Sequence, residues 1–112
     1  MPTKEELVAS LEKMVGKIQL PKNQKRFENY TKTLQFEFTD DSELICHIVF
    51  NNGNATIIDG IEETADMTIT TTAEVIMEVI NGTLSPTRAF MSGKIKAKGP
   101  MPDLMKLQAL MK

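Results

Sequence analysis

The pattern of apolar and polar residues predicts a helix near the start of the chain. Thr3 and Glu6 have the spacing of a capping box, in which each side chain bonds the backbone N–H of the other residue. Large apolar residues then recur every three or four positions, which is the period of an amphipathic helix. We expect this helix over residues 3–17. Residues 19–33 are polar, and we expect an irregular connection there with a helical turn near 27–30.

The next segment changes to the period of two that is typical of β-strands. Leu34, Phe36 and Phe38 alternate with polar residues, so one face of the first strand is apolar and the other is expected to face solvent. The second strand is apolar on both faces. The Asn-Asn-Gly-Asn sequence after it is a strong hairpin signal, because Asn and Gly tolerate positive φ. We expect these strands and the two that follow to pair as a meander. The predicted strands cover residues 34–39, 43–50, 55–59 and 66–70.

Helical periodicity returns after the fourth strand. Thr71 and Glu74 form a second capping box, which opens a helix that runs to the Asn-Gly pair at 81–82. Ser85, which is followed by a proline, begins a short helix that ends before Gly93. Two helices are therefore expected in this part of the chain.

The remaining residues predict one more strand and one more helix. Lysine alternates with small apolar residues over 94–98, and a Gly-Pro break separates this strand from a helix rich in methionine and leucine. The whole order predicts one α+β domain over residues 1–112. Its helices cover one face of a five-stranded, mostly antiparallel sheet.

Charge and cysteine content narrow the function classes. The formal net charge is -2, which gives no general attraction to nucleic acid. From Lys94 onward there are five lysines and one acidic residue. This basic end can bind an anionic surface, or it can simply complement the acidic rest of the chain. The one cysteine excludes an internal disulfide and a cysteine-based zinc site. With no apolar run of 18 residues and no Ser-Lys-Leu ending, we expect a soluble cytoplasmic protein.

The residues that could carry catalysis or bind a metal do not form a recognisable site. His47 is the only histidine, and its neighbour Cys46 points to the opposite face of the strand, so the two cannot act as a pair. Asp40, Asp41 and Glu43 are too few to surround Ca²⁺ and are expected to form a solvated turn. No phosphate-binding loop or nucleophile elbow is present. We therefore expect no enzyme activity, no metal and no cofactor.

Two features near the end of the chain allow both a structural and a functional interpretation. Lys94, Lys96 and Lys98 fall on one side of a strand, where they can protect an exposed sheet edge or contact an anionic membrane or a phosphate group. The methionine and leucine residues after 100 spread around more than one face of the last helix. They can fill a core, or they can form a mobile wall against the apolar residues of 75–80 and 90–91.

The second half of the chain resembles the sterol carrier protein type 2 domain, a family of small lipid-transfer modules. The resemblance is carried by Asp66 with its Thr-Ile-Thr strand, the Ile-Asn-Gly helix end, and the Ala-Phe pair before Gly93-Lys94. It continues through the lysines and glycine that follow to the Leu-Met-Lys-Leu-Gln string of the last helix. The first helix and the strands fit the same plan in order and length.

This resemblance implies a hydrophobic tunnel between the sheet and the helices, and binding of a fatty acid, fatty acyl-CoA, phospholipid or sterol without catalysis. It also implies that the last helix and the short helix around Phe90 line the tunnel, with Gln108 near its mouth. We expect a monomer or weak homodimer that contacts membranes transiently and binds no nucleic acid. The alternative is a module of the same fold with a filled core, which serves as a dimerisation or docking domain for a lipid-metabolising enzyme. The predicted ligand-lining residues are Phe36, Phe38, Ile48, Ile69, Ile76, Ile80, Phe90, Met91, Met101, Leu104, Met105 and Gln108.

Overall fold

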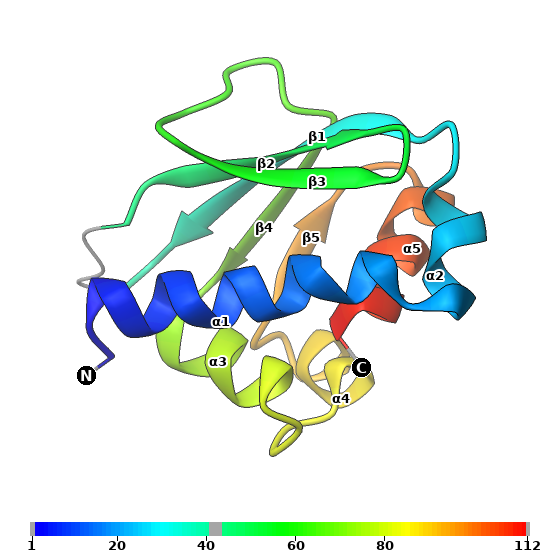
Figure 1. Ribbon diagram of the computed structural model, residues 1–112. Helices are drawn as coiled ribbons and strands as arrows, with labels where there is room; N and C mark the ends of the chain where they lie inside the picture. Colours follow the sequence, from blue (N-terminus) through cyan, green and yellow to red (C-terminus); the bar gives the residue numbers. More distant parts are fainter. Residues whose placement is uncertain (1, 41–43, 112) are drawn as a thin grey trace.

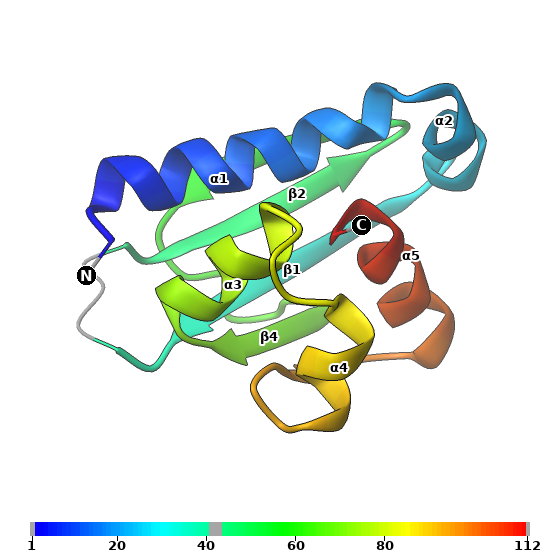
Figure 2. The same cartoon turned by 90° about the horizontal axis from the view of Figure 1, so that it is seen from below.

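The five strands that the described residues of the computed structural model form all join one sheet, and the helices lie on one side of it (Figure 1). The structure describes residues 2–40 and 44–111. The same arrangement is seen from below in Figure 2, where the helices stand in front of the sheet. In chain order the elements are α1 (Lys4–Gly16), η1 (Lys17–Gln19), α2 (Pro21–Phe27), β1 (Thr31–Phe38), β2 (Cys46–Asn51), β3 (Asn54–Asp59), β4 (Met67–Thr71), α3 (Ala73–Ile80), α4 (Pro86–Met91), β5 (Lys96–Lys98) and α5 (Met101–Met111).

The sheet is mixed, and its topology corrects the predicted meander. The strand order is β3-β2-β1-β4-β5; three of the neighbouring pairs are antiparallel, whereas β1 and β4 are parallel. The connection after β3 therefore crosses the sheet, and two contacts hold it there. Gln35 Oε1 accepts from the backbone N–H of Glu62 at 2.7 Å, and Asp66 Oδ2 accepts from the backbone N–H of Thr33 at 2.9 Å. These bonds place the start of β4 beside β1, which strand periodicity alone does not specify.

The hydrophobic core lies between the sheet and the helices. Leu7, Leu11 and Met14 of α1 are each no more than 1% exposed and follow the predicted helical spacing. On β1 and β2 the alternate positions Leu34 and Ile48 are opposite each other in the sheet, and both are fully buried. The period-two and period-3.6 patterns thus converge on the same core, as expected from the sequence.

Two local predictions are corrected by the structure. Residues 21–27, expected to be irregular, form α2, because Pro21 occupies the first turn, where its missing N–H costs nothing. The cap of α3 is Thr72, whose side chain accepts from the backbone N–H of Val75 at 3.1 Å. The neighbouring Thr71 is the last residue of β4 instead, and its buried hydroxyl donates to the carbonyl of Lys94 at 2.9 Å.

A polar contact anchors the first turn of α5 to β1 and α2. The Tyr30 hydroxyl donates to Asp103 Oδ1 at 2.9 Å, and Lys32 Nζ lies 3.6 Å from Asp103 Oδ2. The Lys106 ammonium donates to the carbonyl of Arg26 at 2.7 Å and lies 5.5 Å from the centre of the Tyr30 ring. Burial, and then the hydrogen bond to the Asp103 carboxylate, raise the pKa of Tyr30 well above its ordinary value. The last helix is therefore attached to the sheet at its N-terminal end.

Candidate functional site

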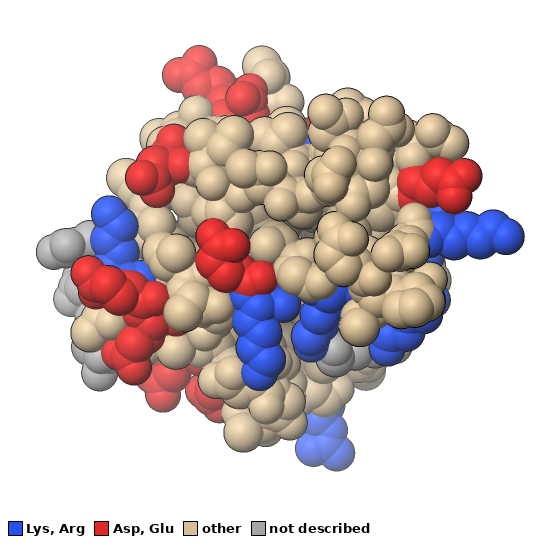
Figure 3. All heavy atoms as spheres, viewed as in Figure 1, with Lys and Arg blue, Asp and Glu red and all other residues tan. Residues whose placement is uncertain are grey.

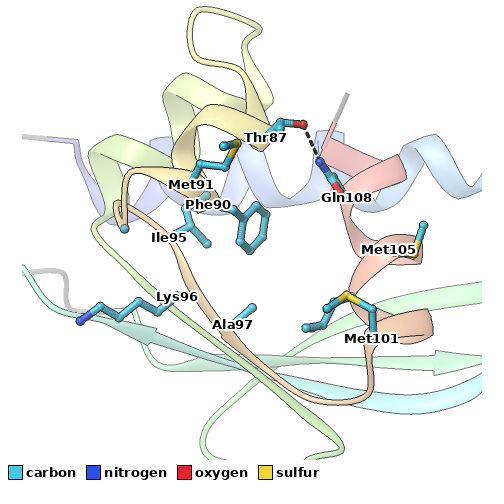
Figure 4. A pocket seen from close by; sticks show the side chains of 11 residues that line it. Thr87, Phe90, Met91, Ile95, Lys96, Ala97, Met101, Met105 and Gln108 are labelled. Carbon is cyan, nitrogen blue, oxygen red and sulfur yellow. Dashed lines mark hydrogen bonds between the residues drawn. The ribbon is translucent and has the colours of Figure 1, made fainter.

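An apolar groove of about 500 Å³ opens between α4, β5 and α5 (Figure 4). The ring of Phe90 projects into it from α4, and Met101 and Met105 face it from α5. The strand β5 and the residues just before it form the remaining wall. The lining residues are Thr87, Phe90, Met91, Gly93, Ile95, Lys96, Ala97, Met101, Leu104, Met105 and Gln108.

Local sequence signals set the positions of both helices around this groove. Ser85 caps α4 by accepting from the backbone N–H of Arg88 at 3.4 Å, and Gly93 ends the helical segment with a φ of 80°. Gly99 lets the chain pass closely over Met67 on its way into α5. A Cβ at Gly99 would lie 2.9 Å from Met67 Cγ, and its φ of 146° also disfavours other residues. These signals therefore fix where α4 begins and ends and where the chain turns from β5 into α5.

The walls of the groove differ in exposure. Ile95 is only 1% exposed and belongs to the core, whereas Met91, Met101 and Met105 are exposed at 83%, 67% and 64%. A contiguous patch of exposed apolar side chains around a concavity often marks a surface that binds another molecule. The groove is thus an open extension of the core, lined on its outer side by flexible methionines.

One hydrogen bond spans the groove from helix to helix. Gln108 Nε2 donates to Thr87 Oγ1 at 2.8 Å, and this bond links α5 to α4 (Figure 4). Both residues are at least partly exposed. The bond places a polar contact at this end of a mainly apolar groove.

The structure divides the predicted lining residues into two groups. Six of them line the groove: Phe90, Met91, Met101, Leu104, Met105 and Gln108. Five others lie in the packed core at 3% exposure or less: Phe36, Ile48, Ile69, Ile76 and Ile80. Phe38 is half-buried and stacks on Phe36 with the ring centres 5.5 Å apart. Phe36, Ile48 and Ile69 lie on the sheet and Ile76 and Ile80 on α3, and neighbouring core side chains fill the space around them. An enclosed tunnel stays a prediction.

The three lysines of the predicted contact surface are exposed but do not share one strand. Lys96 and Lys98 belong to β5, opposite Thr70 and Thr68 of β4, whereas Lys94 precedes the strand. Lys96 contributes to the groove wall, but its ammonium points away from the apolar space (Figure 4). The role of these lysines at a membrane or a phosphate group stays a prediction.

A second cleft, of about 450 Å³, lies on the other side of α5. It shares Met105 and Gln108 with the apolar groove, but it also carries Lys22, Arg26 and Lys106. Figure 3 shows basic side chains at the end of the molecule where α2 lies, while acidic side chains gather toward the opposite end of the same view. A positively charged surface therefore adjoins the apolar groove across a single helix.

His47 and Cys46, which were considered for catalysis, and Asp40, which was considered for a Ca²⁺ site, lie apart from the groove. His47 is 7% exposed, and its Nδ1 lies 3.0 Å from the carbonyl oxygen of Gly60. Cys46 is fully buried, and burial followed by the nearby Asp59 raises the pKa of its thiol to about 11, so it is a poor nucleophile at neutral pH. Asp40 Oδ2 accepts from the backbone N–H of Ala73 at the start of α3.

Metal binding has no support within the described ranges. Among residues 2–40 and 44–111, no group of three His, Cys, Asp or Glu side chains could hold a metal ion. Asp41 and Glu43, which were considered for a Ca²⁺ site, lie outside the described residues.

Four of the groove residues are absent from the predicted site: Thr87, Gly93, Ile95 and Ala97. Ile95 and Ala97 alternate with the lysines along the strand, so their position on the inner face was available as a signal, yet they were not included in the predicted site. Thr87 and Gly93 carry no comparable signal, because only the packing of α4 against α5 brings them to the groove. Lys22 and Arg26 are distant from α5 in sequence and meet it only through the fold.

Comparison with known proteins places the chain in a family. The model of the SCP-2 sterol transfer family matches residues 11–112, which is nearly the whole chain. The chain belongs to this family. An SCP-2 structure from Helicoverpa armigera, a sterol carrier protein domain 2, superposes over 92% of this chain and 82% of its own, with a TM-score of 0.71 and 25% identity. The predicted α+β class with a five-stranded, mostly antiparallel sheet is thereby confirmed.

Two further similar proteins match different lengths of the chain. Human hydroxysteroid dehydrogenase-like protein 2 is 45% identical over 47 residues, which are 42% of this chain but only 11% of that protein. The chain thus spans about a tenth of the length of this curated relative. Sterol carrier protein 2 from Aedes aegypti, solved in complex with the fatty acid palmitate, covers 99% of this chain with a TM-score of 0.64 at 16% identity. That likeness shows the shared fold.

Proposed function

We propose that this SCP-2 domain binds one acyl chain in the groove between α4, β5 and α5 and carries it between membranes without catalysis. The groove itself is the observation that supports this proposal: it is apolar, open, and lined by exposed methionines that gain most from being covered. Its volume of about 500 Å³ lies in the range of small-ligand sites. Palmitate bound to the Aedes aegypti protein, which has the same fold, supports the ligand class.

The energetics allow useful affinity without a strong polar anchor. Each buried methylene contributes about 0.8 kcal/mol, so a chain that buries about fifteen of them gains ~12 kcal/mol. Association and ordering cost about 4 to 15 kcal/mol, so at the lower cost ~8 kcal/mol remains, which corresponds to micromolar binding. Because an apolar wall distinguishes poorly between chain lengths, at about 1–3 kcal/mol per methylene, we expect broad ligand choice.

The head group is proposed to lie beside Gln108 and toward the basic cleft. The Gln108–Thr87 hydrogen bond occupies the polar end of the groove, and Lys22 and Arg26 lie beyond α5. A carboxylate or phosphate there would meet positive charge, while the acyl chain stays among the methionines. This orientation favours a fatty acid, fatty acyl-CoA or phospholipid over an uncharged sterol.

Native mass spectrometry of the protein purified from cells tests the proposed function. We expect one lipid molecule for each chain, which organic extraction would then identify. A protein that is free of lipid and takes up no fluorescent fatty acid would instead indicate a filled core and a docking role. A variant with His47→Ala is expected to keep lipid binding unchanged, because that histidine lies outside the groove. A loss of transfer in this variant would argue against a purely non-catalytic carrier.

Lys94, Lys96 and Lys98 are proposed to guide the protein to anionic membranes, which is the second part of this function. Each well-placed lysine is worth about 1 kcal/mol at such a surface, so the three together contribute ~3 kcal/mol. Replacing all three with Glu should slow transfer between anionic vesicles at low salt by about tenfold or more, and leave transfer between neutral vesicles unchanged. Equal transfer rates for this variant and the wild type at low salt would rule out the role.

The cellular location is also a proposal. None of the described helices is both long and apolar enough to cross a membrane. A lipid carrier with surface lysines suits the cytoplasm, where it can reach several membranes. Fractionation of cells that express the protein, followed by immunoblotting of the soluble and organelle fractions, would test this placement.

A further inference from the structure

The described methionines fall into two clear sets according to exposure. Met14, Met67 and Met111 are each 1% exposed and belong to the core, and Met77 is half-buried on α3. Met91, Met101 and Met105 are exposed at 83%, 67% and 64%, and all three line the apolar groove. Among the described residues, the three methionines that are more than half exposed therefore all line the groove proposed to bind lipid.

We propose that Met91, Met101 and Met105 form a reversible oxidation site, at which conversion to methionine sulfoxide releases the bound lipid. This inference rests on the proposed function of the groove. Leucine would line an apolar groove equally well, since it differs little from methionine in volume. What methionine adds is a flexible chain and a sulfur atom that hydroperoxides can reach.

The chemistry is a two-electron oxygen transfer from a hydroperoxide. The methionine sulfur attacks the terminal oxygen, so that an S–O bond forms while the O–O bond breaks. The sulfur is oxidised by two electrons and the peroxide is reduced, leaving as water or as an alcohol after it takes up a proton. A methionine sulfoxide reductase reverses the change: two thiols become a disulfide, and the oxygen leaves as water.

Among the described residues, the groove methionines are more accessible to an oxidant than Cys46 and the buried methionines. Cys46 is fully buried, and the raised pKa of its side chain, about 11, keeps it in the thiol form, which is unreactive. The buried methionines are shielded by the core, so they can react only if the protein opens. Selective oxidation of the groove therefore leaves the packed part of the molecule intact.

Oxidation changes the groove from apolar to polar where the acyl chain would lie. A sulfoxide is a strong hydrogen-bond acceptor, and covering it with an acyl chain removes water without offering a donor. A buried polar group without a partner costs about 1–3 kcal/mol, which corresponds to a loss of affinity of about tenfold or more for the modified groove. Phe90 and Leu104 keep their positions, so the groove persists but binds lipid weakly.

The test compares binding of fluorescently labelled palmitate before and after mild treatment with hydrogen peroxide. Peptide mass spectrometry should find one added oxygen on each of Met91, Met101 and Met105 before any on the buried methionines. We expect the dissociation constant to rise by about tenfold and to return to its first value after treatment with the reductase. Circular dichroism recorded alongside should show an unchanged fold.

Two variants separate the groove from the rest of the chain. A triple variant, Met91→Leu with Met101→Leu and Met105→Leu, should lose its sensitivity to peroxide, so that its dissociation constant for labelled palmitate after treatment equals its own value before treatment. The matched control Met77→Leu should keep that sensitivity, because this methionine lies outside the groove. A sensitive triple variant would overturn the inference.

The remaining outcomes distinguish this inference from the proposed function. Unchanged affinity after oxidation of all three methionines overturns the switch and leaves the lipid-binding function standing. Loss of the folded signal on oxidation, or earlier reaction at Met14 or Met67, also overturns it. Failure of the untreated protein to bind labelled palmitate would overturn the proposed function itself, and the inference with it.

Discussion

Replacing Ala97 with tryptophan is expected to weaken fatty acid binding by about a hundredfold. Ala97 is half-buried on β5, opposite the fully buried Ile69 of β4, and contributes to the wall of the groove. An indole ring there would occupy the space of about four methylenes of the acyl chain. At about 0.8 kcal/mol for each, this removes ~3 kcal/mol, or about two powers of ten in affinity. Titration with labelled palmitate measures the effect directly.

The matched control for this substitution is Ala55→Trp. Ala55 is also half-buried on a strand, but it lies on β3, outside both the apolar groove and the basic cleft. We expect this variant to bind an acyl chain as the wild type does. If Ala97→Trp bound with wild-type affinity while remaining folded, the acyl chain would have to lie elsewhere.

Replacing Asp103 with alanine is expected to lower the free energy of unfolding by about 2–3 kcal/mol. The Asp103 carboxylate accepts from the Tyr30 hydroxyl at 2.9 Å and lies 3.6 Å from the Lys32 ammonium. Tyr30 is 8% exposed, so its hydroxyl would be left with only the distant sulfur of Met67, at 3.7 Å. Leaving a buried polar group unpaired costs about 1–3 kcal/mol, and hydrogen bonds to charged groups lie at the upper end. Urea denaturation measures the loss against a total stability of about 5–15 kcal/mol.

The ionisation of Tyr30 gives a second measurement of the same contact. Tyr30 is the only tyrosine and the chain has no tryptophan, so tyrosinate formation can be followed by ultraviolet absorbance without overlap. Because burial and the bond to Asp103 raise the pKa of Tyr30, the folded state favours the neutral phenol. Its contribution to stability is therefore present below the ordinary pKa of about 10 and is lost as the pH rises through the folded value. Compared with Tyr30→Phe, the wild type should lose stability more steeply above pH 10, by at most about 1.4 kcal/mol per pH unit.

The conservative variant Asp103→Asn separates the hydrogen bond from the charge. Its amide oxygen can still accept from the Tyr30 hydroxyl, so we expect less than half of the loss seen with alanine. In Asp103→Ala the pKa of Tyr30 should move back toward its ordinary value but stay above it, because burial remains. A tyrosine pKa that does not change in Asp103→Ala would show that this carboxylate does not contact the phenol in solution.

The candidate site was only partly predictable. The resemblance to sterol carrier proteins and the excess of methionine pointed to α4 and α5, and half of the predicted lining residues are in the groove. Ile48 and Ile69 were placed on the correct face of the sheet, but other core side chains cover them. Periodicity shows which face of a strand is apolar. It does not show whether a ligand or another side chain covers that face, because this depends on the volumes of residues distant in the sequence.

The sequence by itself determined the order of the strands and of the helices other than α2 and η1, and it determined the mostly antiparallel five-stranded class. These features follow from local periods and caps, such as the bond between Thr3 and Glu6 that the structure shows at the start of α1. Only the tertiary structure decided that β4 pairs in parallel with β1, that α5 is anchored through Asp103 to Tyr30, and that the exposed methionines meet at one groove. Each of these depends on contacts between residues far apart in the chain, whose energy arises only once the elements pack together.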